Sequence, residues 1–169
     1  MKRVSFLLVL TVMLFIVIIV YGTTHFTDNG NGTIKDNLTG LTWTKCSMKT
    51  ISSSPVMDAT TNCVDTHSEV GNWVEAILAC ENLNYAGKTD WRLPNIKELI
   101  SIVDWKRINP AIDSKYFPRT ENSYYWSSTN KVGSHFNASA WCLNFTNGDF
   151  EGRGKTALTT SFVRCVAGP

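Results

Sequence analysis

The stretch Asp90-Trp91-Arg92-Leu93-Pro94-Asn95-Ile96-Lys97-Glu98-Leu99 decides the fold of this chain of 169 residues. It predicts a helix that starts after Pro94, because Asn95 can cap the first turn and Glu98 follows three residues later, the spacing of a capping box. The apolar residues of this segment recur at helical spacing and form one stripe, made of Ile96, Leu99, Ile100 and Val103.

The residues just before this helix have a predicted structural role. We expect Trp91 to pack in the core and Arg92 to pair with a carboxylate or with backbone carbonyls. Pro94 sets the direction in which the chain enters the helix, because proline restricts its own backbone and that of the residue before it. A ligand contact by Trp91 or Arg92 is the alternative interpretation.

An earlier segment predicts a second helix, from Asn72 to about Asn84. Asn72 and Glu75 have the spacing of another capping box. The apolar residues again recur at helical spacing, at Trp73, Ala76, Ile77, Cys80 and Leu83.

The chain beyond residue 120 predicts strands and turns. Trp126 belongs to a core strand (124–128), in which the serine hydroxyls bond neighbouring backbone. Asn147-Gly148 predicts a tight hairpin turn between strands 140–145 and 149–151. We expect 152–155 to be a loop and 162–166 to form a half-buried strand, from its alternation of side chains.

The beginning of the domain predicts a β-hairpin. Two short β runs, 33–36 and 41–43, flank a turn rich in Asn, Thr and Gly. The preceding cluster 28–32 resembles a calcium loop, but Thr39 stands where such a loop needs a bidentate acid, so turn chemistry is favoured. Strands, two helices and then strands indicate an α+β domain with an antiparallel sheet.

The first 22 residues predict export. Lys2 and Arg3 precede an apolar run over 4–21, which has a length between that of a signal-peptide core and that of a spanning helix. Both a signal peptide cleaved after Gly22 and a retained membrane anchor therefore stay open. In either case residues 23–169 form the domain and lie outside the cytoplasm, secreted, periplasmic or at the cell surface.

The charge of the exported part argues against nucleic-acid binding. The chain has 16 basic and 14 acidic residues, and residues 1–22 hold two of the basic and none of the acidic ones, which leaves 16 − 2 = 14 of each. Recognition of nucleic acid depends on neutralising phosphates, for which a neutral domain is poorly suited.

The five cysteines predict disulfides rather than a metal centre. All of them follow the apolar run, and none has the C-x-x-C spacing of zinc or redox motifs. Cys46 and Cys63 bracket a Ser/Thr-rich loop, and a bridge between them would close that loop, which is worth about 3 kcal/mol in the chain-entropy model. Counting alone leaves the other pairings open.

Four ordered blocks of the chain resemble one known family, the Lcl C-terminal domain, also known as DUF1566. The blocks are Gly32-Thr33-Ile34-x-Asp36-x-x-Thr39-Gly40-Leu41-x-Trp43, Asp90-Trp91-Arg92-Leu93-Pro94-x-x-Lys97-Glu98-Leu99, Trp126-Ser127-Ser128-Thr129 and Val163-Arg164-Cys165-Val166. The resemblance implies a C-type-lectin-like fold, in which two helices pack on a small twisted antiparallel sheet with long loops. It also implies exported bacterial proteins, often adhesin-like or otherwise ligand-binding.

The same resemblance implies a disulfide between the first helix and the last strand, which corresponds to Cys80 and Cys165. Cys142 is then left over. We expect it to be a small buried residue of a strand. The alternative is a free thiol that forms an intermolecular bridge.

The predicted ligand-binding surface is the loop-rich stretch 129–160, where asparagines alternate with small polar and aromatic residues, a composition suited to adaptable hydrogen bonding. Solvated loops share that composition. The candidate contact residues are Trp141, Asn144, Asn147 and Arg153. The motifs by which C-type lectins bind sugars through calcium do not occur, so we expect no metal or other cofactor.

Two hypotheses about function follow. The first is an adhesin-like module that binds an extracellular glycan or protein. The second is a non-catalytic structural subunit of a surface appendage or envelope complex, held by its N-terminal helix. We expect no enzyme activity, because the chain has none of the H-E-x-x-H, P-loop or G-x-S-x-G motifs.

Overall fold

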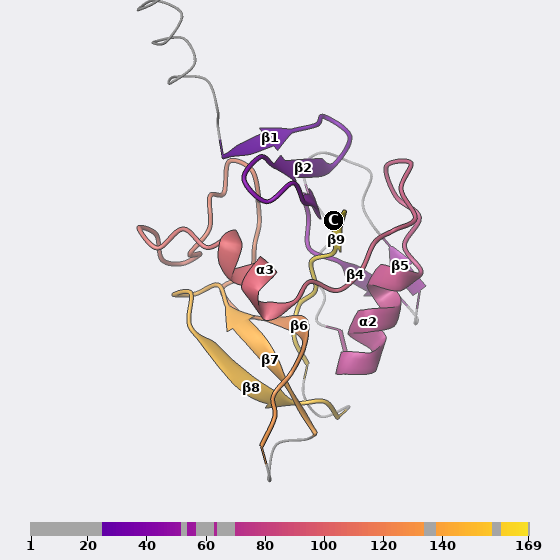
Figure 1. Cartoon of the computed structure of the whole chain (residues 1–169), viewed down its shortest axis with the longest axis vertical. Helices are drawn as coiled ribbons and strands as arrows, with labels where there is room; N and C mark the ends of the chain where they lie inside the picture. The colour runs from indigo at the N-terminus through magenta and orange to yellow at the C-terminus, as the bar shows by residue number, and fades with distance from the viewer. Residues whose placement is uncertain are drawn as a thin grey trace, which may run out of the picture.

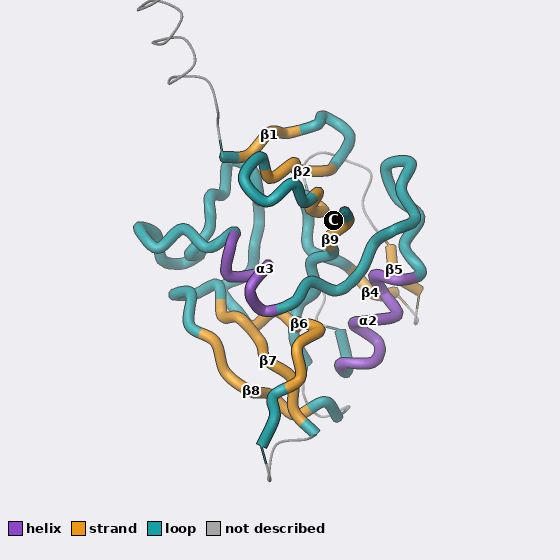
Figure 2. The backbone as a smooth tube through the Cα atoms, viewed as in Figure 1, coloured by secondary structure: helices purple, strands orange, loops and turns teal. Residues whose placement is uncertain are grey.

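The computed structural model describes residues 25–51, 54–56, 63, 70–133, 138–156 and 160–168. The predicted export segment 1–22 lies outside these residues. Long loops connect short strands and two helices (Figures 1 and 2). The described chain is an α+β structure, as predicted.

The first sheet joins the two ends of the domain. It consists of β1 (Phe26–Asp28), β2 (Thr33–Asp36), β3 (Thr42–Thr44) and β9 (Val166–Ala167), in that order and antiparallel (Figure 1). The predicted hairpin is confirmed as β2 and β3, in which Ile34 pairs with Trp43.

Turn chemistry also explains the cluster at 28–32. Asp28 accepts a hydrogen bond from the backbone of Gly30, and its other oxygen lies 2.7 Å from Nζ of Lys45. Asn29 donates to Thr33, which in turn donates to Asn31. The side-chain groups that would bind a cation are therefore used inside the turn.

The remaining strands form two separate sheets. A hairpin joins β4 (Lys49–Ile51) to β5 (Ser54–Val56), and β6 (Tyr124–Asn130), β7 (Ser139–Asn144) and β8 (Phe150–Gly154) form an antiparallel sheet in that order. The prediction of one small sheet was thus too simple, since the strands form three separate sheets.

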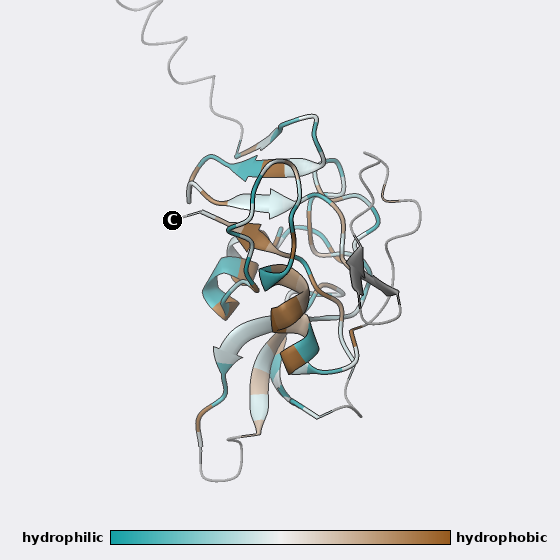
Figure 3. Cartoon of the chain, turned by 90° about the vertical axis from the view of Figure 1, so that its right-hand side faces the viewer, coloured by the Kyte–Doolittle hydropathy of each residue, from teal (hydrophilic) through white to brown (hydrophobic). Residues whose placement is uncertain are grey.

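Both predicted helices are present, as α2 (Trp73–Glu81) and α3 (Ile96–Ser101). The capping box of α3 is complete, because Asn95 and Glu98 each accept a hydrogen bond from the backbone of the other. In α2 the side chain of Asn72 accepts from the backbone of Glu75. Figure 3 shows that polar and apolar residues alternate along the helices.

The three-stranded sheet lies between two apolar cores. Trp126, Ala140 and Cys142 point to one face and pack with residues of α2, whereas Tyr125 and Leu143 point to the other and pack with α3. This alternation is the period of two that a strand imposes on its side chains. The helices therefore cover opposite faces of one sheet.

The residues before α3 have the predicted packing. The side chain of Trp91 is 2% exposed, and its Nε1 donates to the carbonyl of Tyr85 at 3.1 Å. Arg92 binds Glu98. Trp126 is fully buried in β6, and the neighbouring hydroxyl of Ser127 donates to the carbonyl of Trp141 at 2.6 Å.

Two predictions about the last 20 residues were wrong. The return strand does not end at Glu151, because β8 continues to Gly154 through the segment predicted as a loop. Residues 163–167 are all buried, and only Val166 and Ala167 of them are in a strand. The alternation suggested half-burial, but Val163 and Val166 pack in different cores.

Two disulfides hold the domain together. Cys46 bonds Cys63, and Cys80 of α2 bonds Cys165 beside β9. Cys142 is free and fully buried. Bridges of this kind are typical of proteins from an oxidising compartment outside the cytoplasm.

Candidate ligand-binding surface

Polar and aromatic side chains converge at one end of the three-stranded sheet, where β6 and β8 end and β7 begins. The antiparallel register produces this convergence, because it places Asn130 opposite Ala140 and Ala140 opposite Arg153. Backbone hydrogen bonds from Lys131 to Ser139 and from Lys155 to Ala138 extend the pairing beyond the strands.

Three cationic side chains that start from this end lie over aromatic rings. The shortest contact is that of Lys155, whose Nζ lies 4.1 Å from the ring centre of Trp73. The other two distances are 4.3 Å from the guanidinium carbon of Arg153 to Tyr124 and 4.9 Å from Nζ of Lys131 to Trp141. We call these six residues, together with Phe150, the basic–aromatic surface. It has two parts, because Trp73, Tyr124, Arg153 and Lys155 lie on the face of the sheet that packs with α2, whereas Lys131, Trp141 and Phe150 lie on the other face.

Trp141 forms the half-exposed part of this surface next to β8. Its ring meets the edge of Phe150, with 5.6 Å between the ring centres, and Phe150 is 51% exposed. Gly152 makes room for Lys131, because a Cβ atom at position 152 would lie 2.1 Å from Cδ of that lysine. A glycine at this position of β8 therefore allows Lys131 to lie between the strand and Trp141.

The charge of the surface is positive. Glu151 is the one acid within β6, β7 and β8, and its carboxylate lies 3.2 Å from the guanidinium of Arg153. The Nε atom of Arg153 is buried and has no hydrogen-bond partner in the described chain. Three cations and one acid leave an excess of positive charge on the surface, and Lys131 is the cation that lies beside Trp141 and Phe150.

The four candidate contact residues do not form one cluster. Arg153 pairs with Ala140, next to Trp141, but its side chain lies on the other face of the sheet. Asn144 and Asn147 lie at the opposite end of β7, in the turn before β8. Both side chains already form hydrogen bonds there. Asn144 accepts one from the backbone of Thr146, and Asn147 forms two with Asp149.

Five members of the surface were not among the predicted contact residues, namely Trp73, Tyr124, Lys131, Phe150 and Lys155. Arg153 and Lys155 are two residues apart, the spacing that places side chains on one face of a strand. This spacing could not be recognised from the sequence, because residues 152–155 were predicted to be a loop and not a strand.

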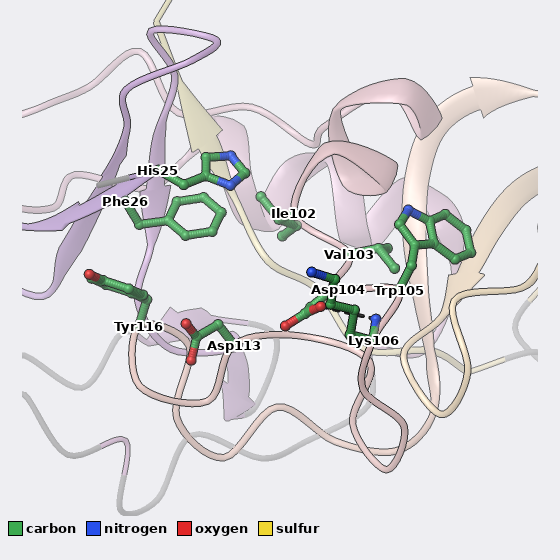
Figure 4. A pocket seen from close by; sticks show the side chains of 9 residues that line it. All are labelled: His25, Phe26, Ile102, Val103, Asp104, Trp105, Lys106, Asp113 and Tyr116. Carbon is green, nitrogen blue, oxygen red and sulfur yellow. Dashed lines mark hydrogen bonds between the residues drawn. The ribbon is translucent and has the colours of Figure 1, made fainter. Parts of the chain in front are cut away.

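A second concavity lies beside β1 and the loop after α3. It has a volume of about 560 Å³, and Figure 4 shows the side chains that line it, which include His25, Asp104, Trp105 and Asp113. Arg107 already pairs with both carboxylates, at 2.8 Å to Asp104 and 3.8 Å to Asp113. The backbone N–H of Lys106 has the largest effect on Asp104 and lowers its pKa; burial acts against this, and the hydrogen bond from Arg107 lowers the pKa further.

Two classes of feature were not found in the described part of the chain. No group of three or more His, Cys, Asp and Glu side chains there is placed to hold a metal ion. None of the described helices has the length and apolar character needed to cross a membrane.

Comparison with known proteins places the chain in a family. A search of curated proteins found no significant match. The sequence profile described as the Lcl C-terminal domain matches residues 32–167, which is most of the chain and includes both helices and all three sheets except β1. The chain therefore belongs to the Lcl C-terminal domain family.

Proposed function

We propose that this protein is an exported, adhesin-like binding module without catalytic activity. It engages an extracellular glycan or protein through the basic–aromatic surface of the three-stranded sheet. We propose with it the C-type-lectin-like fold that the family implies, in which a rigid core presents the ends of a small sheet to a ligand.

The observation that carries this proposal is the group formed by Trp141, Phe150 and Lys131. Its two rings meet edge to face, one of them is half-exposed, and a cation lies over the other. Aromatic residues and cations that stay accessible together are enriched at binding surfaces, because the ring supplies apolar area at a small cost in conformational entropy.

The chemistry of the group selects for a ligand with apolar ring faces and negative charge. The C–H face of a sugar can stack on an exposed aromatic ring, and an acidic substituent can pair with a nearby Lys or Arg. An acidic glycan meets both requirements. A protein that offers a carboxylate beside an apolar side chain meets them as well.

The rigidity of the surface also supports a binding role. Lys131, Arg153 and Lys155 are held on rings or by hydrogen bonds, so less side-chain freedom is lost when a ligand binds. The disulfide between Cys80 and Cys165 holds α2, and with it Trp73, against the C-terminal segment.

The test is a screen of neutral and acidic glycans and of extracellular-matrix proteins, with and without calcium. The protein is exported to a periplasm and purified with its disulfides intact. We expect saturable binding that does not need calcium, and a loss of affinity of at least about tenfold in Trp141→Ala, as for a buried aromatic at the centre of a contact.

Trp105→Ala is the matched control, because Trp105 is 64% exposed but lies outside the basic–aromatic surface. Binding that Trp105→Ala abolishes and Trp141→Ala leaves intact would contradict the proposed surface. A folded protein that binds nothing on the array would contradict the module itself and favour a structural subunit of an envelope complex.

A further inference from the structure

The outer edge of β8 has no strand partner within the described chain. The sheet order is β6-β7-β8, and β7 is the strand that pairs with β8. Figure 1 shows β8 along the outer side of this sheet. Its five residues follow β7 in unbroken register from Phe150 to Gly154 and contain no proline.

Proteins protect edge strands with proline, a β-bulge, charges or a covering segment, because the free N–H and C=O groups can pair with another chain. Of these features, β8 has the charged pair Glu151 and Arg153 but no proline. The register shift of this sheet lies between β6 and β7, on the far side from the outer edge of β8. An exposed regular strand of this kind is suited to pairing.

We propose that β8 pairs antiparallel with β8 of a second copy of this chain, around a two-fold axis at Gly152. The joined sheet would have six strands, three from each copy. An interface on a two-fold axis uses the same surface twice, so the strand must be complementary to itself. This inference goes beyond the proposed ligand binding, with whose surface β8 shares Phe150 and Arg153, and it is tested without ligand.

The sequence of β8 determines the register. A shift by one residue would set outward-facing backbone groups against inward-facing ones, so only shifts that keep the alternation are possible. A centre at Glu151 would place two acids opposite each other, and a centre at Arg153 would place two arginines opposite each other. With the centre at Gly152, Glu151 faces Arg153 of the second copy at both ends.

The charged face of the strand suits this register. The side chains of Glu151 and Arg153 are 51% and 27% exposed, and they already lie 3.2 Å apart within one chain. In the dimer the two pairs would bring four charged side chains together, so that each has a neighbour of opposite charge across the strands. Opposite charges directly across two strands stabilise the pairing, and like charges destabilise it.

The other face is complementary as well. With the centre at Gly152, Phe150 lies opposite Gly154 of the second copy, and the reverse pair forms on the other side of the axis. Phe150 is 51% exposed, and an aromatic ring across from a strand glycine covers the backbone that the glycine leaves open. Pairing would thus bury apolar surface on one face and match charges on the other.

The experiment is sedimentation equilibrium, from micromolar to near-millimolar concentration and without any ligand. The full chain is exported to a periplasm and purified in the form the host leaves it, so that all variants share one N-terminus. We expect a concentration-dependent dimer. Glu151→Arg should weaken it at least about tenfold, because two arginine pairs then face each other across the axis.

Charge exchange makes the test specific. In an equimolar mixture of Glu151→Arg and Arg153→Glu, every pair across the interface is again of opposite charge, so a heterodimer should form although each variant alone is monomeric. The double variant Glu151→Arg/Arg153→Glu should dimerise with itself. Circular dichroism and thermal unfolding establish that the variants are folded.

Glu81→Arg is the control for a change of two charge units, since Glu81 lies exposed on α2 and far from β8 in the fold. It should leave the dimer intact. A wild-type protein that stays monomeric at the highest concentration, or a Glu151→Arg variant that dimerises as tightly as the wild type, would overturn the proposal, and so would a mixture that fails to form the heterodimer.

Discussion

Glu98 binds Arg92 with both of its carboxylate oxygens, each at 2.8 Å, and one of these oxygens also accepts the backbone N–H of Asn95 at 2.8 Å. One side chain therefore caps α3 and fixes Arg92, two residues before Pro94. The backbone of Arg92 in turn exchanges two hydrogen bonds with Val166 of β9. Glu98 thus connects the start of a helix with the end of the chain.

Glu98→Gln should lower the free energy of unfolding by about 1–2 kcal/mol. An amide can keep part of the cap, but it cannot accept two hydrogen bonds from the guanidinium and gives up the charge that strengthens them. Urea unfolding followed by tryptophan fluorescence measures the change. Glu81→Gln, at an exposed position of α2, is the control, and an equal loss in both variants would contradict the role of Glu98.

The stabilisation by Glu98 should depend on pH. Burial raises the pKa of this carboxyl, but the hydrogen bonds from Arg92 and Asn95 outweigh burial and hold the pKa below its ordinary value of 4.5. A carboxyl with a lowered pKa in the folded state stabilises the fold above the unfolded pKa, and it loses that effect as the pH falls through the folded pKa.

The difference in unfolding free energy between wild type and Glu98→Gln should therefore be complete at neutral pH and shrink as the pH falls below about 4.5. Unfolding in urea at a series of pH values gives this difference directly. A difference that stays constant down to the acid limit of folding would show that the charge of Glu98 does not contribute.

Even a conservative substitution of Arg164 should destabilise the fold. Its guanidinium is fully buried, donates to the carbonyls of Thr44 and Lys45 and to the hydroxyls of Ser47 and Thr120, and lies 5.0 Å from the ring centre of Phe117. None of the ion pairs between described residues includes it. The guanidinium of Arg164 thus donates its hydrogen bonds to neutral oxygen atoms and not to a carboxylate.

Arg164→Lys should cost about 3 kcal/mol or more, because one ammonium cannot reach these acceptors together and leaves several of them buried without a partner. Thermal unfolding measures the loss. Arg119→Lys, on an exposed arginine, is the matched control and should be nearly neutral. Equal melting temperatures of the two variants would contradict the assigned role.

Cys142 should not react in the folded protein. Burial raises the pKa of this thiol to about 12, although the charge of Arg153 acts in the opposite direction. Only about one molecule in ten thousand then carries the reactive thiolate at pH 8. The structure thus supports a small buried residue rather than a thiol available for an intermolecular bridge.

Alkylation without reductant, followed by mass spectrometry, tests this expectation. We expect no added mass under native conditions and one added group per chain in denaturant, because the other four cysteines are in disulfides. Cys142→Ala should add none in either condition. Rapid modification of the native wild type would show that Cys142 is accessible.

Short-range patterns were enough to predict much of the fold. The capping residues Asn72 and Asn95 start the two helices where expected, since a cap is decided by residues within one turn. The hairpin of β2 and β3 follows from its turn residues for the same reason. The pairing of Cys80 with Cys165, in contrast, came from the resemblance to a family and not from the spacing of the cysteines.

The sequence by itself determined the two helices, the hairpin of β2 and β3, the family and the separation of an apolar first segment from a neutral domain. Only the tertiary structure decided that Arg164 is buried, that β8 extends to Gly154 and that Lys131, Arg153 and Lys155 meet aromatic rings. The physical reason is how far apart in the sequence the interacting residues lie. Caps and turns depend on neighbours along the chain, whereas burial and cation–ring contacts depend on the register between strands that are far apart in sequence.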